Sequence, residues 1–357
     1  MNLSNLPYLI QKEILDHLFI NQLLFFSLCS KNTKNFIKET QKHRLEKVER
    51  VTYSTRNTCE AIYVKTVNES YDAPVMYLFK STEDFQESRR NGPLQVVRLN
   101  ELATPIDLIC CLTMDPNLHG EYSPDTLESK IESIHSQLYD LLGNDTKFWL
   151  ESCEYDPEGG PHFLPLLHNI QKADVFGRGF ESSKIDEFLD KSTCLEQFSF
   201  GLYQEQPAIR LRENSKLYYL DTVYVSTMGC RSCPMANDVL KRFNGRHAFL
   251  HARIDTSDVI QFLNEWKSGE KYKNLELISL DFEFNLQEIR NSIEIKQADR
   301  EVEYSFVTKF GQYCHFSHLD SGEFKSRWYM VRESDGHVAS LMLTPNLIMM
   351  GVWNMTE

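Results

Sequence analysis

The chain lacks an excess of positive charge. Among its 357 residues, 38 are Lys or Arg and 51 are Asp or Glu, which gives a formal net charge of −13. Nucleic-acid binding needs a basic surface that neutralises phosphates, and an anionic membrane surface attracts the same residue types. We therefore expect neither nucleic acid nor a membrane among the main partners.

Long apolar runs are also missing. No segment reaches the roughly 18 continuous apolar residues that span a bilayer, and the first residues lack the basic segment and apolar run of a signal peptide. The nine cysteines are odd in number and scattered, as is typical of reduced thiols. These features predict a chain that works in the cytoplasm, the nucleus or both.

Common catalytic signatures are absent as well. The sequence contains no Gly-x-x-x-x-Gly-Lys phosphate loop and no Gly-x-Ser-x-Gly nucleophile motif. Gly177-x-Gly179 precedes a helix-like segment, but Ser182 takes the third position of a dinucleotide-binding fingerprint. The eleven histidines and many carboxylates form no set to which catalytic roles can be given. We expect a chain without catalytic residues and without a cofactor.

The first forty residues contain three short amphipathic segments. From Pro7 onward, Ile10, Ile14, Leu15 and Leu18 recur at helical spacing. Asn21 is expected to cap a second helix, and a third helix follows it. A segment this short does not bury a core of its own. Its apolar faces must therefore be covered by the rest of the chain or by another protein.

This stretch resembles an F-box. The family motif is matched, in order, by Leu6-Pro7, Ile14-Leu15, Leu18, Leu23-Leu24, Cys29-Ser30-Lys31 and Phe36-Ile37. Cys29 stands where many members have Val, the tryptophan common near Thr33 is absent, and the run from Ser27 to Lys31 is similar to nematode F-box proteins. The resemblance implies docking on a Skp-type adaptor of a cullin-RING (SCF) ubiquitin ligase. The residues expected to contact the adaptor are Leu6, Pro7, Ile10, Ile14, Leu15, Leu18, Leu23 and Leu24.

The region after the F-box-like stretch reads as short strands followed by a long helix. Strand-like runs occupy residues 51–54, 61–64, 75–79 and 95–99, and the helix is expected over 123–142. These patterns leave open whether residues 45–145 form a domain of their own.

A coarse repeat follows from about residue 147. Strand-like runs begin near residues 174, 195, 222, 247 and 275, and helix-like segments lie at 183–189, 235–243 and 257–267. The spacing fits the 20–29-residue period of a strand-plus-helix repeat, although the Asn or Cys ladder of true leucine-rich repeats is missing. We predict a leucine-rich-repeat-like sheet with helices on one side; the alternative is an irregular α/β domain.

The last segment predicts a β-hairpin. Apolar runs at 327–331 and 338–343 flank Ser334-Asp335-Gly336, and Asp-Gly favours a tight turn. Arg332, Asp335, Gly336 and Ala339 resemble the end of the F-box-associated domain of nematode F-box proteins, and Phe262–Gly269 adds a second likeness. The resemblance is clearest over residues 180–345, and it implies a substrate-receptor region.

A zinc site is the sharpest competing interpretation. Cys230, Cys233, His247 and His251 have the spacing of a Cys-Cys-His-His finger. However, Asn237 stands where a finger has an aromatic residue, and Asn244-Gly245 interrupts the helix that should carry the histidines. We therefore expect a strand at 247–251 and no metal.

The sequence as a whole predicts an α+β or α/β protein. Residues 1–42 form a three-helix F-box, and residues 43–357 form a mixed strand-helix domain, leucine-rich-repeat-like, that ends in a β-hairpin. The expected function is that of a substrate-receptor subunit of an SCF ubiquitin ligase, with a Skp-type adaptor, a cullin bound through it and an unknown target protein as partners. Two alternatives stay open: a zinc- or nucleotide-binding enzyme-like domain in residues 150–350 behind an ordinary helical hairpin, and a non-degradative F-box scaffold.

Overall fold

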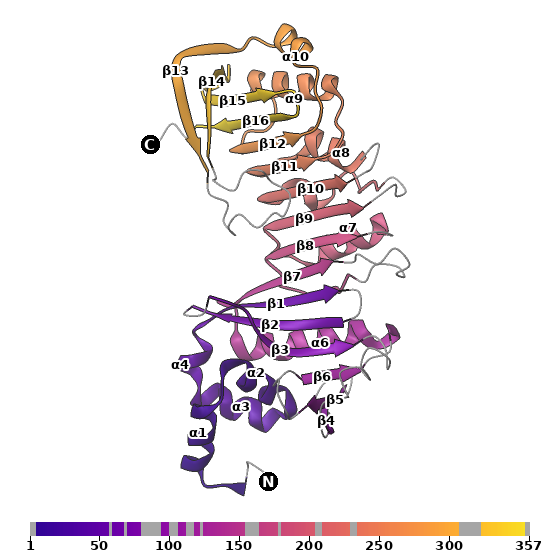
Figure 1. Cartoon of the computed structure of the whole chain (residues 1–357), viewed down its shortest axis with the longest axis vertical. Coiled ribbons are helices and arrows are strands. Elements are labelled where there is room, and N and C mark those ends of the chain that lie inside the picture. The colour runs from indigo at the N-terminus through magenta and orange to yellow at the C-terminus, as the bar shows by residue number, and fades with distance from the viewer. Residues whose placement is uncertain are drawn as a thin grey trace. The chain divides into compact units, whose positions relative to one another are not determined.

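The computed structural model describes residues 5–56, 59–67, 70–79, 94–99, 106–111, 118–121, 124–153, 164–177, 180–203, 209–228, 234–306 and 323–353. Its contacts divide the chain into two compact units (Figure 1). Unit 1 comprises Met1–Asp156 and Pro165–Gln171, and unit 2 comprises Pro157–Leu164 and Lys172–Glu357.

Unit 1 combines N-terminal helices with a mixed sheet and one long helix. Its elements are α1 (Tyr8–His17), α2 (Ile20–Cys29), α3 (Lys31–Thr40), α4 (Lys42–Leu45), β1 (Val48–Arg56), β2 (Cys59–Thr66), β3 (Ala73–Phe79), β4 (Leu94–Leu99), β5 (Ile106–Cys111), β6 (Leu118–Glu121), α6 (Pro124–Leu142) and β7 (Lys147–Cys153). The strand order is β7-β1-β2-β3-β6-β5-β4.

Pairing in unit 1 follows from its connections. β1, β2 and β3 follow one another closely in the chain and pair antiparallel, whereas β7 follows the long helix α6 and pairs parallel to β1. Helix α2 packs on α6, β2 and β3. The N-terminal helices are therefore part of unit 1, and the predicted boundary after residue 42 does not coincide with the division of the contacts.

Unit 2 begins as parallel strands linked by helices and ends as antiparallel strands. Its elements are β8 (Lys172–Gly177), α7 (Ser182–Lys191), β9 (Gln197–Tyr203), the short 3₁₀ helix η3 (Lys216–Tyr219), β10 (Thr222–Met228), α8 (Pro234–Arg242), β11 (His247–His251), α9 (Thr256–Ser268), β12 (Leu277–Asp281), α10 (Leu286–Ser292), β13 (Lys296–Ser305), β14 (Glu323–Val331), β15 (Val338–Thr344) and β16 (Leu347–Val352). The strand order is β13-β14-β15-β16-β12-β11-β10-β9-β8.

The parallel part of unit 2 is regular. Strands β8 to β12 begin at Lys172, Gln197, Thr222, His247 and Leu277, so three intervals of 25 residues precede one of 30. Figure 1 shows α7, α8 and α9 on one face of these strands. A core cluster that includes Tyr224, Phe249, Leu277, Tyr304 and Met349 joins β10, β11 and β12 to β13 and β16. β11 and β12 read as nearly continuous apolar runs, as is typical of strands that are buried on both faces.

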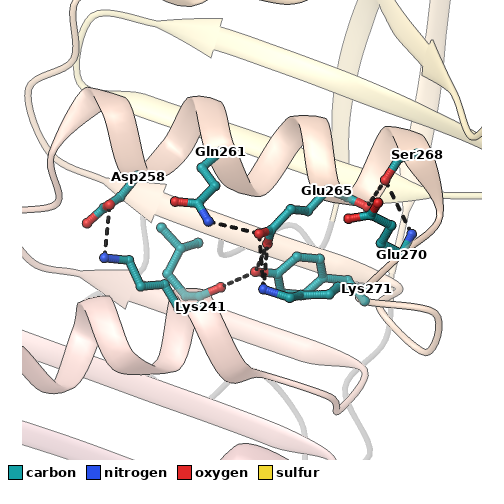
Figure 2. A network of polar contacts seen from close by, with 9 residues as sticks. Lys241, Asp258, Gln261, Glu265, Ser268, Glu270 and Lys271 are labelled. Carbon is teal, nitrogen blue, oxygen red and sulfur yellow. Dashed lines mark hydrogen bonds and ion pairs between the residues drawn. The ribbon is translucent and has the colours of Figure 1, made fainter.

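Polar contacts join successive strand-helix segments. Asn274 Nδ2, just before β12, donates to Asn244 O, between α8 and β11, at 3.1 Å. Figure 2 shows a second connection, in which Lys241 of α8 pairs with Asp258 of α9 at 3.0 Å. Glu265 accepts from Gln261 and pairs with Lys271 just before β12. These contacts fix the spacing between α8, α9 and the next strand.

The connection between β14 and β15 docks on the end of α9. The Arg332 guanidinium pairs with Asp335 and lies 5.4 Å from the ring centroid of Trp266 in α9. Glu333 N–H donates to Lys267 O at 2.8 Å, which satisfies a carbonyl that a helix end leaves without an intrahelical partner. The two segments that resemble an F-box-associated domain are thus joined in space.

Several elements differ from the sequence-based expectations. Strands β5, β6 and β13 and helix α10 were not predicted. Asn21 was expected to cap the second helix, but α2 begins at Ile20 and the Asn21 side chain donates to Pro74 O of β3 at 2.8 Å. The cap prediction was wrong because the amide has a better partner in the sheet.

Candidate protein-binding site

Helix α1 has little contact with the rest of unit 1. Of its ten residues only Leu15 is buried, whereas Tyr8, Leu9 and Ile10 are 59%, 75% and 49% exposed. A helix is stabilised mainly by packing of its apolar face. The Tyr8 ring meets Phe36 of α3 edge-on, with centroids 5.6 Å apart, but the first turn of α1 still presents a largely exposed apolar surface.

Helix α2 is apolar on nearly all sides, and its sequence is INQLLFFSLC. Leu23, Leu24 and Leu28 are buried in unit 1, but Phe26 is 39% exposed and Phe19, which precedes the helix, is 71% exposed. A helix that is apolar all round is expected to be covered on all sides. We call Tyr8, Leu9, Ile10, Phe19 and Phe26 the exposed apolar set.

The C-terminal end of α1 is held by polar contacts from α4 and from Gln41, which precedes α4. The Arg44 guanidinium donates to Leu15 O at 2.9 Å and also to Leu18 O, and Gln41 Nε2 donates to Asp16 Oδ1 at 2.6 Å. A cation at the C-terminal end of a helix matches the helix dipole and satisfies free carbonyls. These contacts position α1 although it contributes little to the core.

Helix α3 is fixed to α6 by a partly buried ion pair. Lys34 Nζ lies 2.6 Å from Asp140 Oδ2 and 2.7 Å from Gln137 Oε1. The hydrogen bond from Lys34 lowers the pKa of Asp140. Ser30 accepts from Thr33 N–H at 3.1 Å and so caps the start of α3. These contacts hold α3 against α6, and α2 packs on both helices.

The structure separates the predicted contact residues into two groups. Pro7 and Ile10 are exposed, and Leu6, Ile14 and Leu18 are half-buried. Leu15, Leu23 and Leu24 are 0% exposed and form the core between the helices. The second group packs between the helices of unit 1, and its contact with an adaptor remains a prediction.

The predicted contact residues do not include Tyr8, Leu9, Phe19 or Phe26. Helical spacing identifies the buried stripe, and these four residues lie outside that stripe. The signal for Phe26 was the excess of apolar residues in α2 beyond what one face can hold. Arg44 was not identified either, because its role depends on contacts with the end of α1 and not on a local pattern.

The proposed zinc ligands fall partly outside the described residues. Cys230 and Cys233 are not described, whereas His247 and His251 lie on strand β11, as expected. His247 is 2% exposed and lies 3.2 Å from Thr222 Oγ1, and His251 Nδ1 lies 3.1 Å from Asp281 Oδ2. Among the described residues no group of three or more His, Cys, Asp or Glu is placed to hold a metal.

The helices in the described part of the chain include none that is long and apolar enough to cross a membrane. Comparison with protein families finds one match: residues 3–45 fit the model of the F-box domain. This range contains α1, α2, α3 and α4. Neither the curated proteins nor the solved structures include a match to the chain. F-box domains generally bind Skp-type adaptors.

Proposed function

We propose that this F-box protein is a substrate-receptor subunit of an SCF ubiquitin ligase. Residues of α1 and α2 bind a Skp-type adaptor, the adaptor links the chain to a cullin, and the C-terminal region binds a target protein. The chain needs no catalytic residue for this role. Tethering raises the effective concentration of target lysines near the enzyme that transfers ubiquitin.

The observation that carries the proposal is the exposed apolar set within the matched F-box. Five large apolar side chains in residues 8–26 are 39–75% exposed. Apolar and aromatic side chains of this kind become buried when an amphipathic helix binds a groove of a partner protein. The polar contacts of Arg44 and Lys34 fix these helices before the partner binds, which lowers the entropy lost on binding.

The first test replaces Phe19 with Glu and measures binding of the purified full chain to a Skp-type adaptor. We expect Phe19→Glu to weaken adaptor binding by about 30-fold, because an aromatic anchor at an interface contributes about 2 kcal/mol or more. Phe19 is 71% exposed, so the substitution leaves the core of unit 1 unchanged. Isothermal titration or co-elution on size exclusion gives the readout.

Tyr71→Glu is the matched control. Tyr71 is 68% exposed and lies between β2 and β3, outside the F-box match. We expect this variant to bind the adaptor like the unmodified chain. Equal binding by Phe19→Glu and Tyr71→Glu would contradict the proposed adaptor site.

The receptor role requires its own measurement. A target captured by the full chain should be ubiquitinated in a reconstituted SCF reaction, and Phe19→Glu should abolish this while leaving capture intact. Capture without ubiquitination would instead favour a scaffold that does not direct degradation.

A further inference from the structure

The edge strand of unit 2 contains an unusually long irregularity. Gln297 of β13 pairs with Trp328 of β14, and the next registered pair is Val302 with Ser326. Four residues of β13, Ala298 to Glu301, therefore stand opposite Arg327 alone. Bulges of this kind bend a strand away from its neighbour and often occur beside binding sites.

A pocket of about 650 Å³ lies at this irregularity. It is lined by β13 and β14 together with Val338, Ser340 and Trp353. Its volume falls within the usual range for pockets that bind a ligand or a side chain. All of its lining residues belong to the described part of unit 2.

The wall formed by Trp353 is held in place. Its indole Nε1–H donates to Ser340 Oγ at 2.9 Å, and its backbone N–H donates to Val338 O at 2.8 Å. Its ring meets Tyr304 edge-on, with centroids 5.5 Å apart. Trp353 is therefore oriented before any ligand arrives, and preorganisation favours binding.

The polarity of the pocket changes from its floor to its mouth. Ser340 is buried, and Tyr329, Val338 and Trp353 are half-buried. Gln297, Asp299 and Arg327 are exposed. An apolar or aromatic side chain fits such a floor, and the peptide backbone that carries it meets polar groups at the mouth.

The charges at the mouth are unequal. Arg327 Nε lies 3.9 Å from Glu301 Oε1, so an acidic partner already faces it. Asp299 makes no ion pair with any residue of the described chain, and the chain as a whole carries a net charge of −13. A basic residue next to the inserted side chain would complement Asp299.

We propose that this pocket binds an extended peptide segment of a partner protein that inserts an aromatic side chain and carries a Lys or Arg beside it. The aromatic ring packs against Trp353 and Tyr329, and the basic residue pairs with Asp299. Peptide binding by this pocket does not depend on the adaptor. The further conclusion that the bound peptide belongs to a ubiquitination target rests on the proposed receptor function.

The test is selection of a random heptapeptide phage library on the immobilised full chain. We expect enriched peptides to contain an aromatic residue with an adjacent Lys or Arg. No enrichment, or enrichment without an aromatic residue, would overturn the proposal. An acidic neighbour in place of the basic one would overturn the role of Asp299.

Two matched variants locate the binding. Ala298 lines the pocket and Arg300 does not, although both belong to the same irregularity of β13. Ala298→Trp should fill the pocket and weaken binding of a synthetic enriched peptide at least 10-fold, whereas Arg300→Trp should leave it unchanged. Equal affinity of the two variants would place the peptide elsewhere and refute the proposal.

Adaptor binding serves as the independent measurement. Ala298→Trp should bind the Skp-type adaptor normally, and Phe19→Glu should bind the peptide normally. Unchanged amide protection of β14, β15 and β16 shows that unit 2 of Ala298→Trp is folded. Loss of adaptor binding in Phe19→Glu with intact peptide binding separates the two proposals, since each can then fail alone.

Discussion

His135 of unit 1 is a buried histidine whose two ring nitrogens both have partners. Nε2 donates to His168 O at 2.8 Å, and Nδ1 accepts from Tyr53 Oη at 3.0 Å. This arrangement suits the neutral ring. Burial, with a smaller contribution from His168, lowers the pKa of His135 to about 4.

This pKa shift makes the stability of unit 1 depend on pH. The unfolded chain takes up a proton near pH 6.5, whereas the folded chain does so only near pH 4. The free energy of unfolding therefore falls as the pH drops through this window, by about 2 kcal/mol between pH 7.5 and pH 5. Chemical denaturation of the full chain at several pH values measures this slope.

His135→Gln is the control for that slope, because glutamine keeps one donor and one acceptor but does not titrate. The variant should lose the contribution of His135 to the pH dependence. An unchanged slope would assign the effect to other groups.

At the scale of elements, the end of α9 and the turn after β14 depend on one glycine. Gly269 has φ +80°, and a Cβ at this position would lie 2.0 Å from Ser334 Oγ and 2.5 Å from Ser334 Cβ. Gly143, which follows α6, has φ +79° with nothing within 4 Å of its Cβ position. The two glycines share a conformation but differ in their surroundings.

Gly143→Ala should therefore destabilise the chain by about 1 kcal/mol, the penalty of a left-handed backbone alone. Gly269→Ala should cost about 2–3 kcal/mol, because the new methyl group also displaces the turn. Denaturant unfolding compares the two variants, and hydrogen exchange shows whether α9 loses protection.

Ser334→Gly added to Gly269→Ala should restore part of the loss, since it removes the clashing side chain. Equal destabilisation by the two alanine variants would mean that the turn adapts without loss.

The sequence predicted those elements whose structure follows from the spacing of apolar residues within a short segment. The apolar face of α6, the parallel strands of unit 2 and strand β11 at His247–His251 all follow from local patterns. The amide of Asn21 was misread because its partner, Pro74, is 53 residues away. β13 was missed because it is an exposed edge strand rich in charge, which blunts the period-2 pattern that marks a strand.

The candidate site shows the same limit. Helical spacing identified Leu15, Leu23 and Leu24, but these residues are buried. Spacing predicts which residues share a face, and only the packing shows which face the chain itself covers. For the same reason the pocket beside Trp353 was invisible, because it depends on the register of β13 against β14.

At the scale of the whole molecule, the N-terminal helices and α6 stabilise each other. Lys34 pairs with Asp140, and α2 packs on α6. Deletion of residues 1–45 should therefore expose apolar surface on α6 and β3 and lower amide protection throughout unit 1. Unit 2 should keep its protection, because these contacts all belong to unit 1.

Hydrogen exchange with mass spectrometry on the full and shortened chains measures this effect. Unchanged protection of α6 after the deletion would contradict this mutual stabilisation and show that the rest of unit 1 folds without the F-box. For the same reason, point variants are better probes of adaptor binding than truncation.

The exposed apolar side chains in the first turn of α1 also affect the solubility of the chain. Side chains such as Leu9, at 75% exposed, promote self-association when no partner covers them. A binding partner stabilises the dispersed form by mass action. The yield of soluble chain should then rise with the amount of co-expressed adaptor and level off near one adaptor per chain, so that the supply of the partner limits the amount of soluble F-box protein.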